Sequence, residues 1–163
     1  MQVFISRLLV LFVLSAGLLL SGCGFHLRGQ IDVPPSLLRM HVKGNDIDLV
    51  HDIEKSLKFS DIVIVEEGGD AALLDLSDTT YVKEVNGTDN NGIATNYKMT
   101  YTVNYVVYDA AREVLQKQKL NQSRTLSYDA ADILLFEREE IFLVEDMRKD
   151  LISQMLRRMS KIK

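Results

Sequence analysis

A strict alternation of apolar and polar residues near the middle of the chain limits the fold more than any other feature. Six residues at every second position share one face: Tyr97, Met99, Tyr101, Val103, Tyr105 and Val107. Successive side chains of a β-strand point to opposite faces of a sheet, so this segment predicts a strand that is buried on one side. The whole chain has 163 residues, 47% of them apolar and 26% charged, which is a globular composition. This length fits one domain, or one domain with an appendage.

Four more strands are expected around this one, from the apolar spacing and the turn residues that bound them. They cover residues 37–42, 62–65, 72–85 and 114–122. In the first, one face carries Leu38, Met40 and Val42, and the short β-branched second strand is expected to be buried. In the third, one face carries Ala72, Leu74, Leu76, Thr80 and Val82. The last strand is polar on both faces, which is typical of an edge strand whose lysines discourage further pairing.

Two helices are expected to flank these strands. Apolar residues at helical spacing after Asp46 predict a helix from about Ile47 to Lys58. The same spacing near the end of the chain involves Ile141, Val144, Met147, Leu151, Met155 and Met159, with basic residues in the last turns. The order of elements predicts an α+β domain. It is a two-layer sandwich in which a mixed, mostly antiparallel sheet of about four to five strands packs both helices on one face.

The N-terminal segment predicts a secretory signal of the lipoprotein type. Arg7 precedes an uncharged apolar run over residues 8–20, which is shorter than the roughly 20 residues of a spanning helix. The run ends in Leu20-Ser21-Gly22-Cys23, which resembles the bacterial lipobox, where the chain is cut before an acylated cysteine. The alternative is a buried anchor helix with an incidental cysteine. The lipoprotein interpretation gives a signal peptide over residues 1–22, a lipidated tether over 23–36 and one domain over 37–163.

Several functions are excluded or disfavoured by the composition and the motifs. The lone Cys23 excludes an internal disulfide and a multi-cysteine zinc site, and its acylation would remove it from catalysis. A net charge of −4 argues against a general nucleic-acid-binding protein. The sequence has no nucleophile elbow, phosphate-binding loop or dinucleotide-binding glycine motif, and no metal-ligand spacing. We therefore expect no enzyme, no metal site and no cofactor beyond the N-acyl and S-diacylglycerol groups on Cys23.

The residues that follow the lipobox carry a family resemblance. Cys23-Gly24-Phe25-His26-Leu27-Arg28-Gly29 resembles the mature N-terminus of the lipopolysaccharide-assembly lipoproteins of the LptE (RlpB) family. Later segments resemble the family pattern in the same order: Val33-Pro34-Pro35, Tyr97-Lys98-Met99, Val103-Asn104, Val144-Glu145-Asp146-Met147 and Leu156-Arg157-Arg158. The resemblance implies a lipid-anchored outer-membrane protein of a Gram-negative bacterium. It also implies that the protein binds the LptD β-barrel as plug and assembly partner, and contacts lipopolysaccharide on its way to the outer leaflet.

Candidate contact residues follow from this resemblance. Lipopolysaccharide phosphates would be bound by Lys or Arg as charge-assisted donors, although each candidate is otherwise a solvated strand charge. These candidates are Lys83, Lys98, Arg112, Lys117, Lys119 and Arg124. Residues 86–92 are expected to form a mobile hairpin loop that contacts the barrel through Asn86, Asn90 and Asn91. The dense apolar runs 133–136 and 141–144, which add Phe136 and Phe142 as barrel contacts, are either core or a partner-facing patch.

A second function of a different class stays open at this point. A lipid-anchored envelope module that binds a small lipid or cell-wall ligand would be a stable solo domain with a concave apolar pocket. A barrel plug would instead need its partner and would present polar surface to a polar lumen. An envelope hydrolase would need a nucleophile-and-base pattern, which the sequence lacks. The opening from Cys23 to Arg28 is expected only for the plug.

Overall fold

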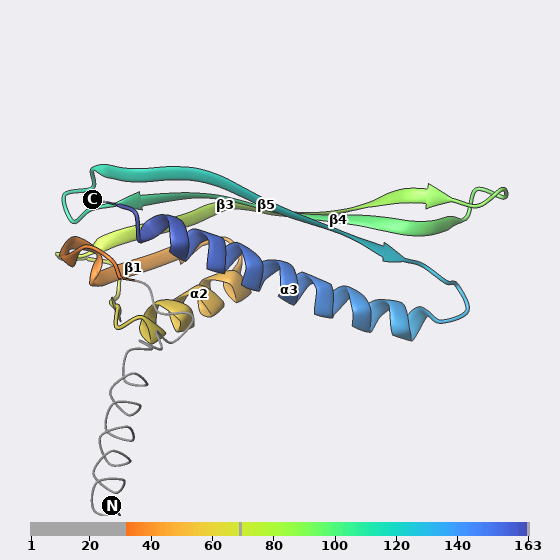
Figure 1. Cartoon of the computed structure of the whole chain (residues 1–163), viewed down its shortest axis with the longest axis horizontal. Helices are drawn as coiled ribbons and strands as arrows, with labels where there is room; N and C mark the ends of the chain where they lie inside the picture. Colours follow the sequence, from red (N-terminus) through yellow and green to blue (C-terminus); the bar gives the residue numbers. More distant parts are fainter. Residues whose placement is uncertain (1–31, 69, 163) are drawn as a thin grey trace, which may run out of the picture. The chain divides into compact units, whose positions relative to one another are not determined.

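The computed structural model describes residues 32–68 and 70–162, which belong to one compact unit. The signal peptide, the lipidation site Cys23 and the resemblance around Phe25 lie outside the described residues. The elements are η1 (Pro35–Leu37), β1 (Arg39–Gly44), α2 (Ile47–Phe59), β2 (Val63–Ile64), β3 (Ala72–Thr88), β4 (Ala94–Tyr108), β5 (Val114–Ser127) and α3 (Ile133–Met159). The five strands form one sheet, and both helices lie on the same face of it (Figure 1). The two-layer α+β prediction is confirmed.

The sheet has the strand order β2-β1-β3-β4-β5. β1 runs parallel to both β2 and β3, while β3, β4 and β5 pair antiparallel in sequence order. β5 is an edge strand, as its polar faces predict. The alternation in β4 is also confirmed, because its inward residues from Met99 to Val107 are at most 1% exposed.

The two N-terminal strands differ from the prediction. Pro35, with its fixed backbone φ, starts a 3-10 turn that ends at the fully buried Leu37, and β1 begins only at Arg39. Leu38 is therefore exposed and does not share a face with Met40 and Val42. β2 has two residues and lies at the other edge of the sheet, where it pairs only with β1. Its expected burial is wrong, since Val63 is exposed and the buried residue is the preceding Ile62.

A β-bulge in β3 changes which residues face the helices. Between Asp75 and Asp78 this strand has one residue more than the paired stretch of β4. Leu74, before the bulge, is buried against the helices, whereas Thr80 and Val82, after it, are exposed on the other face. The expectation that Thr80 and Val82 continue the face of Leu74 is therefore wrong.

The turn between β1 and α2 holds this bulge in place. The Asn45 side-chain amide donates to the Thr79 carbonyl at 2.9 Å, and its oxygen accepts from the Thr79 N–H at 3.2 Å. Gly44 allows the close approach, because a Cβ there would come within 2.8 Å of the Val50 side chain. α2 then begins after Asp46, whose side chain accepts a hydrogen bond from the Leu49 N–H at 3.0 Å.

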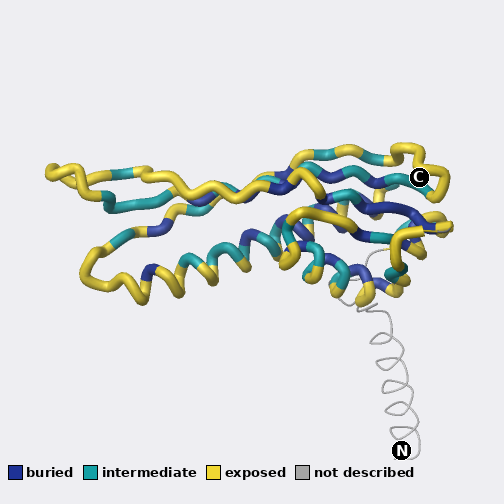
Figure 2. Tube along the Cα trace, turned by 180° about the vertical axis from the view of Figure 1, so that it is seen from behind, coloured by how far each residue is buried: buried dark blue, intermediate teal, exposed yellow. Residues whose placement is uncertain are grey.

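Burial along α3 divides the domain into two halves (Figure 2). Four residues at helical spacing are fully buried in its C-terminal part: Met147, Leu151, Met155 and Met159. Ile141, expected to begin this apolar stripe, is instead 63% exposed. We call residues 81–98 and 123–146 the distal half and the other described residues the proximal half. In the described part of the chain, no helix is long and apolar enough to cross a membrane.

Candidate functional site

An aromatic cluster joins the hairpin to the N-terminal end of α3 in the distal half. Tyr97 of β4, Tyr128 after β5 and Phe136 of α3 lie with ring centroids 5.1–5.6 Å apart, two of the three pairs edge to face. Such ring pairs contribute about 0.5–1.5 kcal/mol each beyond the area they bury. Phe136, a predicted barrel contact, is only 9% exposed, because its ring packs against Tyr97 and Tyr128.

An ion pair closes the same cluster. The Lys83 ammonium lies 2.7 Å from a Glu140 carboxylate oxygen, and 5.4 and 5.7 Å from the ring centroids of Phe136 and Tyr97. The Tyr81 hydroxyl donates to the other Glu140 oxygen at 3.0 Å. Burial and this carboxylate raise the pKa of Tyr81 above its ordinary value. The positive charge of Lys83, a candidate lipopolysaccharide contact, is therefore compensated within the domain.

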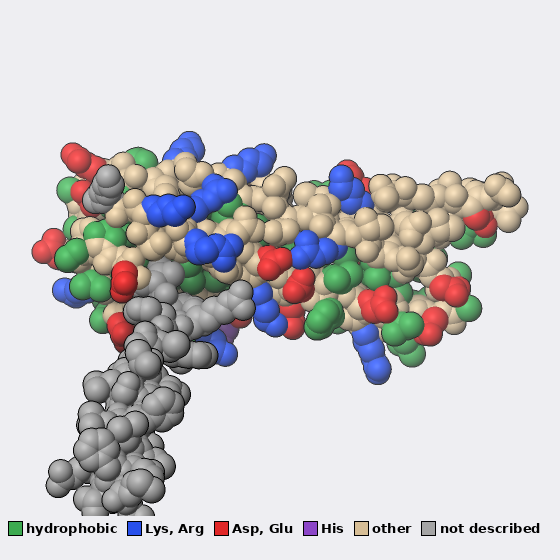
Figure 3. Space-filling model, viewed as in Figure 1, with side chains coloured by type: hydrophobic (Ala, Val, Ile, Leu, Met, Phe, Trp, Pro, Cys, Tyr) green, Lys and Arg blue, Asp and Glu red, His purple; other side chains and the backbone are tan. Residues whose placement is uncertain are grey.

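The outer side of α3 in the distal half is an exposed apolar stripe. It consists of Ile133, Leu134, Leu135, Ile141 and Phe142. Leu134 is 72% exposed and Phe142 68%, and seven residues separate Leu134 from Ile141 and Leu135 from Phe142, about two helical turns. Figure 3 shows hydrophobic side chains between acidic ones over this end of α3. Of the two dense apolar runs, these five residues are thus not core.

The hairpin tip at this end of the domain is shorter than the sequence predicts. β3 continues to Thr88, so Asn86 lies in the strand, and only residues 89–93 connect β3 to β4. The Asp89 carboxylate accepts from the backbone N–H groups of Ile93 and Asn91, each at 2.8 Å. These hydrogen bonds lower the pKa of Asp89. Asn90 and Asn91 are exposed at the tip, which is an ordered turn organised by one carboxylate.

The remaining basic candidates fall on different surfaces. Arg124 faces the helices, with one guanidinium nitrogen 3.1 Å from Asp146 and 2.7 Å from Asp150 of α3. Arg112 lies in the β4–β5 turn at the far end of the proximal half, with a φ of 65°. The structure therefore does not gather the six candidates into one anion site.

Three lysines project from the sheet face opposite the helices. Lys117 and Lys119 lie two positions apart on β5, and Lys98 lies on β4. Lys119 pairs with Asn104, six positions along β4 from Lys98, which corresponds to about 20 Å. Lys98 and the two β5 lysines can thus contact one extended, multiply charged ligand but not a single phosphate group.

Several residues of the distal and central contacts were not predicted from the sequence. Glu140 and Tyr128 close the aromatic cluster, and Arg148 of α3 reaches α2 by donating to Asp52 at 3.1 Å and Asp48 at 3.2 Å. Asp48 and Asp52 of α2 thus connect the two helices through Arg148. Of these residues, only Glu140 could have been suspected from the sequence, because it ends a run of four charged residues between the two apolar runs. The sequence does not say which of the four faces the sheet.

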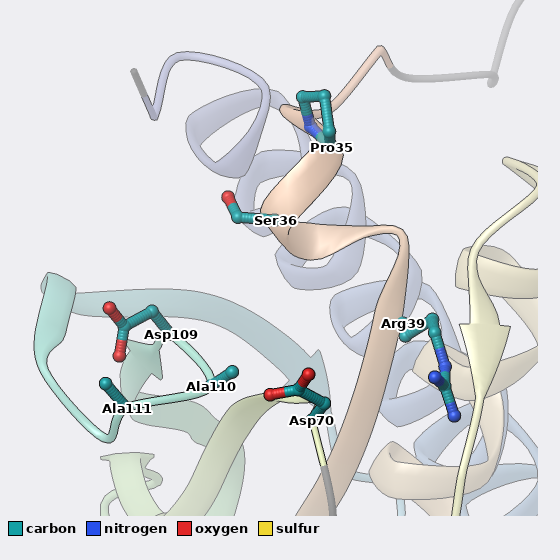
Figure 4. A pocket seen from close by; sticks show the side chains of 7 residues that line it. All are labelled: Pro35, Ser36, Arg39, Asp70, Asp109, Ala110 and Ala111. Atoms are coloured by element: carbon teal, nitrogen blue, oxygen red, sulfur yellow. The ribbon is translucent and has the colours of Figure 1, made fainter.

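Two open depressions were identified in the described residues. One of about 520 Å³ is lined by Pro35, Ser36, Arg39, Asp70, Asp109, Ala110 and Ala111, and Figure 4 shows its two carboxylates and its short alanine side chains. Another of about 440 Å³ is lined by Asp48, Glu137, Glu140, Ile141, Val144, Glu145 and Arg148. Charged residues border both, and neither is an enclosed apolar cavity of the kind that holds a lipid chain.

The fold is shared with solved lipoproteins. A solution structure of an uncharacterized lipoprotein B from Nitrosomonas europaea superimposes with a TM-score of 0.69 at 25% identity, over 84% of this chain and 90% of that one. Rare lipoprotein B from Shewanella oneidensis gives a TM-score of 0.64 at 22% identity, over 75% of this chain and 93% of that one. The second likeness speaks for the fold alone.

Sequence comparisons point to one family. LPS-assembly lipoprotein LptE of Photorhabdus laumondii is 32% identical over 101 residues, which are 60% of this chain and 56% of that protein. LptE of Yersinia enterocolitica is 26% identical over 157 residues, 94% of this chain and 75% of that protein. The match thus spans little more than half of the Photorhabdus protein. The family model LptE, lipopolysaccharide-assembly, matches residues 40–159. Because this match covers most of the chain, the protein belongs to the LptE family of lipopolysaccharide-assembly lipoproteins.

Proposed function

We propose that this protein is a lipid-anchored outer-membrane subunit that forms a complex with a large β-barrel of the LptD type. In this complex it acts as the plug and assembly partner of the barrel, and it contacts lipopolysaccharide on the way to the outer leaflet. It carries out no chemical turnover. The observation that carries the proposal is the apolar stripe on α3, which the domain leaves exposed at the same end as the hairpin tip (Figure 1).

The apolar stripe supports a protein partner at the distal half. Contiguous exposed apolar side chains on a soluble domain mark an interaction surface more often than scattered ones do. Phe142 and Leu134 are more than two thirds exposed, although Phe136 on the same helix is buried. The cluster around Phe136 thus holds α3 in a fixed position while its outer side is left free for a partner.

The uncovered face of the sheet supports a polar environment around the domain. In the described part of the chain this face carries no helix (Figure 1). Along β4 and β5 its residues include Thr100, Thr102, Asn104, Asn121, Ser123 and Thr125. The lumen of a large outer-membrane barrel is lined by polar groups, which match such a face.

Direct contact with lipopolysaccharide is assigned to the lysines of this uncovered face. Lys98, Lys117 and Lys119 have no carboxylate within 4.0 Å among the described residues. Lys83 and Arg124 are compensated by Glu140 and by two aspartates, so they contribute less to any anion site. Charge-assisted donors spaced along two strands suit a ligand with several phosphates.

The test is recovery of tagged protein from its native outer membrane in mild detergent, with mass spectrometry of what accompanies it. Stoichiometric recovery of one large β-barrel protein is the expected result. Photo-crosslinkers at Asn91 and Phe142 should then label that barrel, while one at Lys55, exposed on α2 in the proximal half, should not. Recovery of the lipoprotein alone would overturn the proposal.

The alternative of a solo envelope module for a small lipid or cell-wall ligand has less support. It requires a concave apolar pocket, and the depressions near Asp109 and Glu140 are open and bordered by charge. Both functions share the lipid anchor. Mass spectrometry of the N-terminal peptide tests that anchor directly, because the expected acyl groups add a defined mass to Cys23.

A further inference from the structure

The side of α3 that runs along β5 changes the sign of its charge from one half of the molecule to the other. Asp146 and Asp150 lie on this side in the centre of the helix and bind Arg124 of β5. Arg157 follows Asp146 by eleven residues, about three turns of α3, so it lies on the same stripe. Lys161 lies in the turn that follows the end of α3 at Met159. The acidic half of the stripe is thus partly compensated within the domain by one guanidinium.

The basic half of the stripe meets only neutral partners. Arg158 beside it donates to the Gln118 side-chain oxygen at 2.7 Å, and the Gln116 amide donates to the Arg158 carbonyl at 3.2 Å. Lys117 and Lys119 alternate with these glutamines on the same edge strand. Among the described residues, no carboxylate lies within 4.0 Å of these two lysines, of Arg157 and Arg158, or of Lys161 in the turn after α3.

The three basic residues at the end of α3 and in the turn after it form what we call the edge patch: Arg157, Arg158 and Lys161. Figure 3 shows Lys and Arg side chains gathered over β5 and the C-terminal part of α3. Arg157 and Lys161 are exposed, and the patch lies beside the edge strand β5, where Arg158 contacts Gln118. Long, flexible cations on such an edge suit an extended array of anions better than one enclosed phosphate.

The position of the edge patch points to a membrane surface. The first described residues and the end of α3 lie at the same end of the sheet (Figure 1). Cys23, where the acyl chains are expected, precedes Asp32 by nine residues, which span about 30 Å at most. A bilayer that holds those chains is therefore within reach of the edge patch.

We propose that the edge patch lies on anionic phospholipid headgroups of the leaflet that holds the acyl anchor, and thereby sets which edge of the domain faces the membrane. A bacterial lipoprotein is already held firmly by its acyl chains, so the patch acts on orientation rather than on membrane affinity. The inference rests on the lipid anchor and not on the barrel partner. A failure of one proposal therefore leaves the other standing.

The test uses the full lipidated chain in vesicles without any barrel. Acylation consumes the thiol of Cys23, so Ser160→Cys beside the patch introduces the only free thiol for a fluorophore. Nitroxide lipids should quench this fluorophore in vesicles that contain phosphatidylglycerol, much less in phosphatidylcholine alone, and less at high salt. A fluorophore on Asn91→Cys in the distal half should not be quenched in either lipid.

Paired variants decide whether the patch is responsible. Arg157→Glu with Lys161→Glu should lower the ratio of docked to undocked protein by more than roughly 30-fold, because loss of two basic residues near an anionic surface already accounts for about that factor. Arg157→Gln with Lys161→Gln guards against misfolding and should give a smaller loss in the same direction. The matched control, Arg138→Glu with Lys149→Glu, changes the same charge elsewhere on α3 and should leave the quenching unchanged.

Three results would overturn the inference. One is equal quenching in neutral and anionic vesicles, and another is equal loss in the patch and control variants. The third is quenching that appears only when lipopolysaccharide replaces phosphatidylglycerol, which would assign the patch to the transported lipid instead.

Discussion

The proximal and distal halves of this domain use the same strands and the same long helix but are held together differently. In the proximal half, Leu151 and Met155 of α3 are fully buried against strand residues such as Val103 and Tyr105. In the distal half, the helix is joined to the hairpin by three rings and by the ion pair between Lys83 and Glu140. The proximal half is an apolar core. The distal half is held by a small polar and aromatic group, which we call the clasp: Tyr81, Lys83, Tyr97, Tyr128, Phe136 and Glu140.

This difference separates folding from recognition within one helix. The proximal residues bury their apolar area internally, which is the main source of stability. The distal residues hold α3 at a fixed distance from the hairpin without covering Leu134 or Phe142. The partner surface is thus displayed on a helix that the proximal core stabilises and the distal contacts hold near the hairpin.

The largest expected effect is on stability in the proximal half. Leu151→Ala should lower the free energy of unfolding by about 2–5 kcal/mol, because it leaves a cavity at a fully buried position. Leu134→Ala, the same change on the exposed stripe, should stay within about 0.5 kcal/mol. Urea denaturation followed by circular dichroism measures both. Equal losses would show that the two halves do not differ as described.

The next effect is on binding and belongs to the distal half. Phe142→Asp should reduce recovery of the barrel partner by roughly tenfold or more, since aromatic residues at the centre of an interface often contribute that much. Its melting temperature should hardly change, because the side chain is 68% exposed. Quantitative mass spectrometry after affinity purification gives the readout, with Phe59→Asp as control, a half-exposed phenylalanine at the end of α2 in the proximal half. Unchanged recovery of the barrel would remove Phe142 from the interface.

A smaller effect tests the clasp itself. Glu140→Gln breaks the ion pair with Lys83 and should cost about 1 kcal/mol of local stability. Amide hydrogen exchange in residues 133–146 should then accelerate roughly fivefold, while residues 147–159 keep their protection. Glu139→Gln, at the exposed neighbouring position, is the matched control. Acceleration along the whole helix would mean that α3 unfolds as one unit.

Sequence patterns predicted β4 better than β3, for a physical reason. Burial in β4 follows period two without interruption because the strand is paired on both sides and covered by helices. The pattern in β3 failed at Thr80 because the bulge depends on Asn45, which is 34 residues away from Thr79. A local pattern contains no information about such a contact.

The candidate site shows the same limit. The sequence identified Phe136 and Phe142 as one apolar group, and only the packing of Tyr128 against Phe136 separates a buried ring from an exposed one. Likewise, helical spacing predicted that the buried face of α3 begins at Ile141, because the sequence does not show where the sheet that covers the helix ends. Which charged residues are compensated also depends on contacts across the fold, as for Lys83 and Arg124.

The smallest expected effect is on the pH dependence of stability, which we expect to differ between a tyrosine of the proximal half and one of the distal half. Burial raises the pKa of Tyr105 to about 12, although the nearby positive charge of Arg158 opposes the shift. A tyrosine whose pKa is raised on folding stabilises the folded state fully below its unfolded pKa of about 10, and this contribution is lost as the pH rises toward 12. Tyr105→Phe should therefore make unfolding less steeply dependent on pH between about 10 and 12. Near neutral pH it should cost under about 1 kcal/mol, for the lost hydroxyl bond to Gln116.

Tyr81→Phe provides the distal counterpart of this measurement. Its pKa is also raised by burial and by Glu140, but its hydroxyl belongs to the clasp and not to the core. Alkaline ionisation of Tyr81 places a second negative charge beside Glu140 and should loosen residues 133–146 before the domain unfolds. Tyr81→Phe should remove this local step in hydrogen exchange and leave the global alkaline transition in place. If the global transition shifted equally in both variants, the clasp and the core would be one cooperative unit, and the partner surface would be no less stable than the fold that supports it.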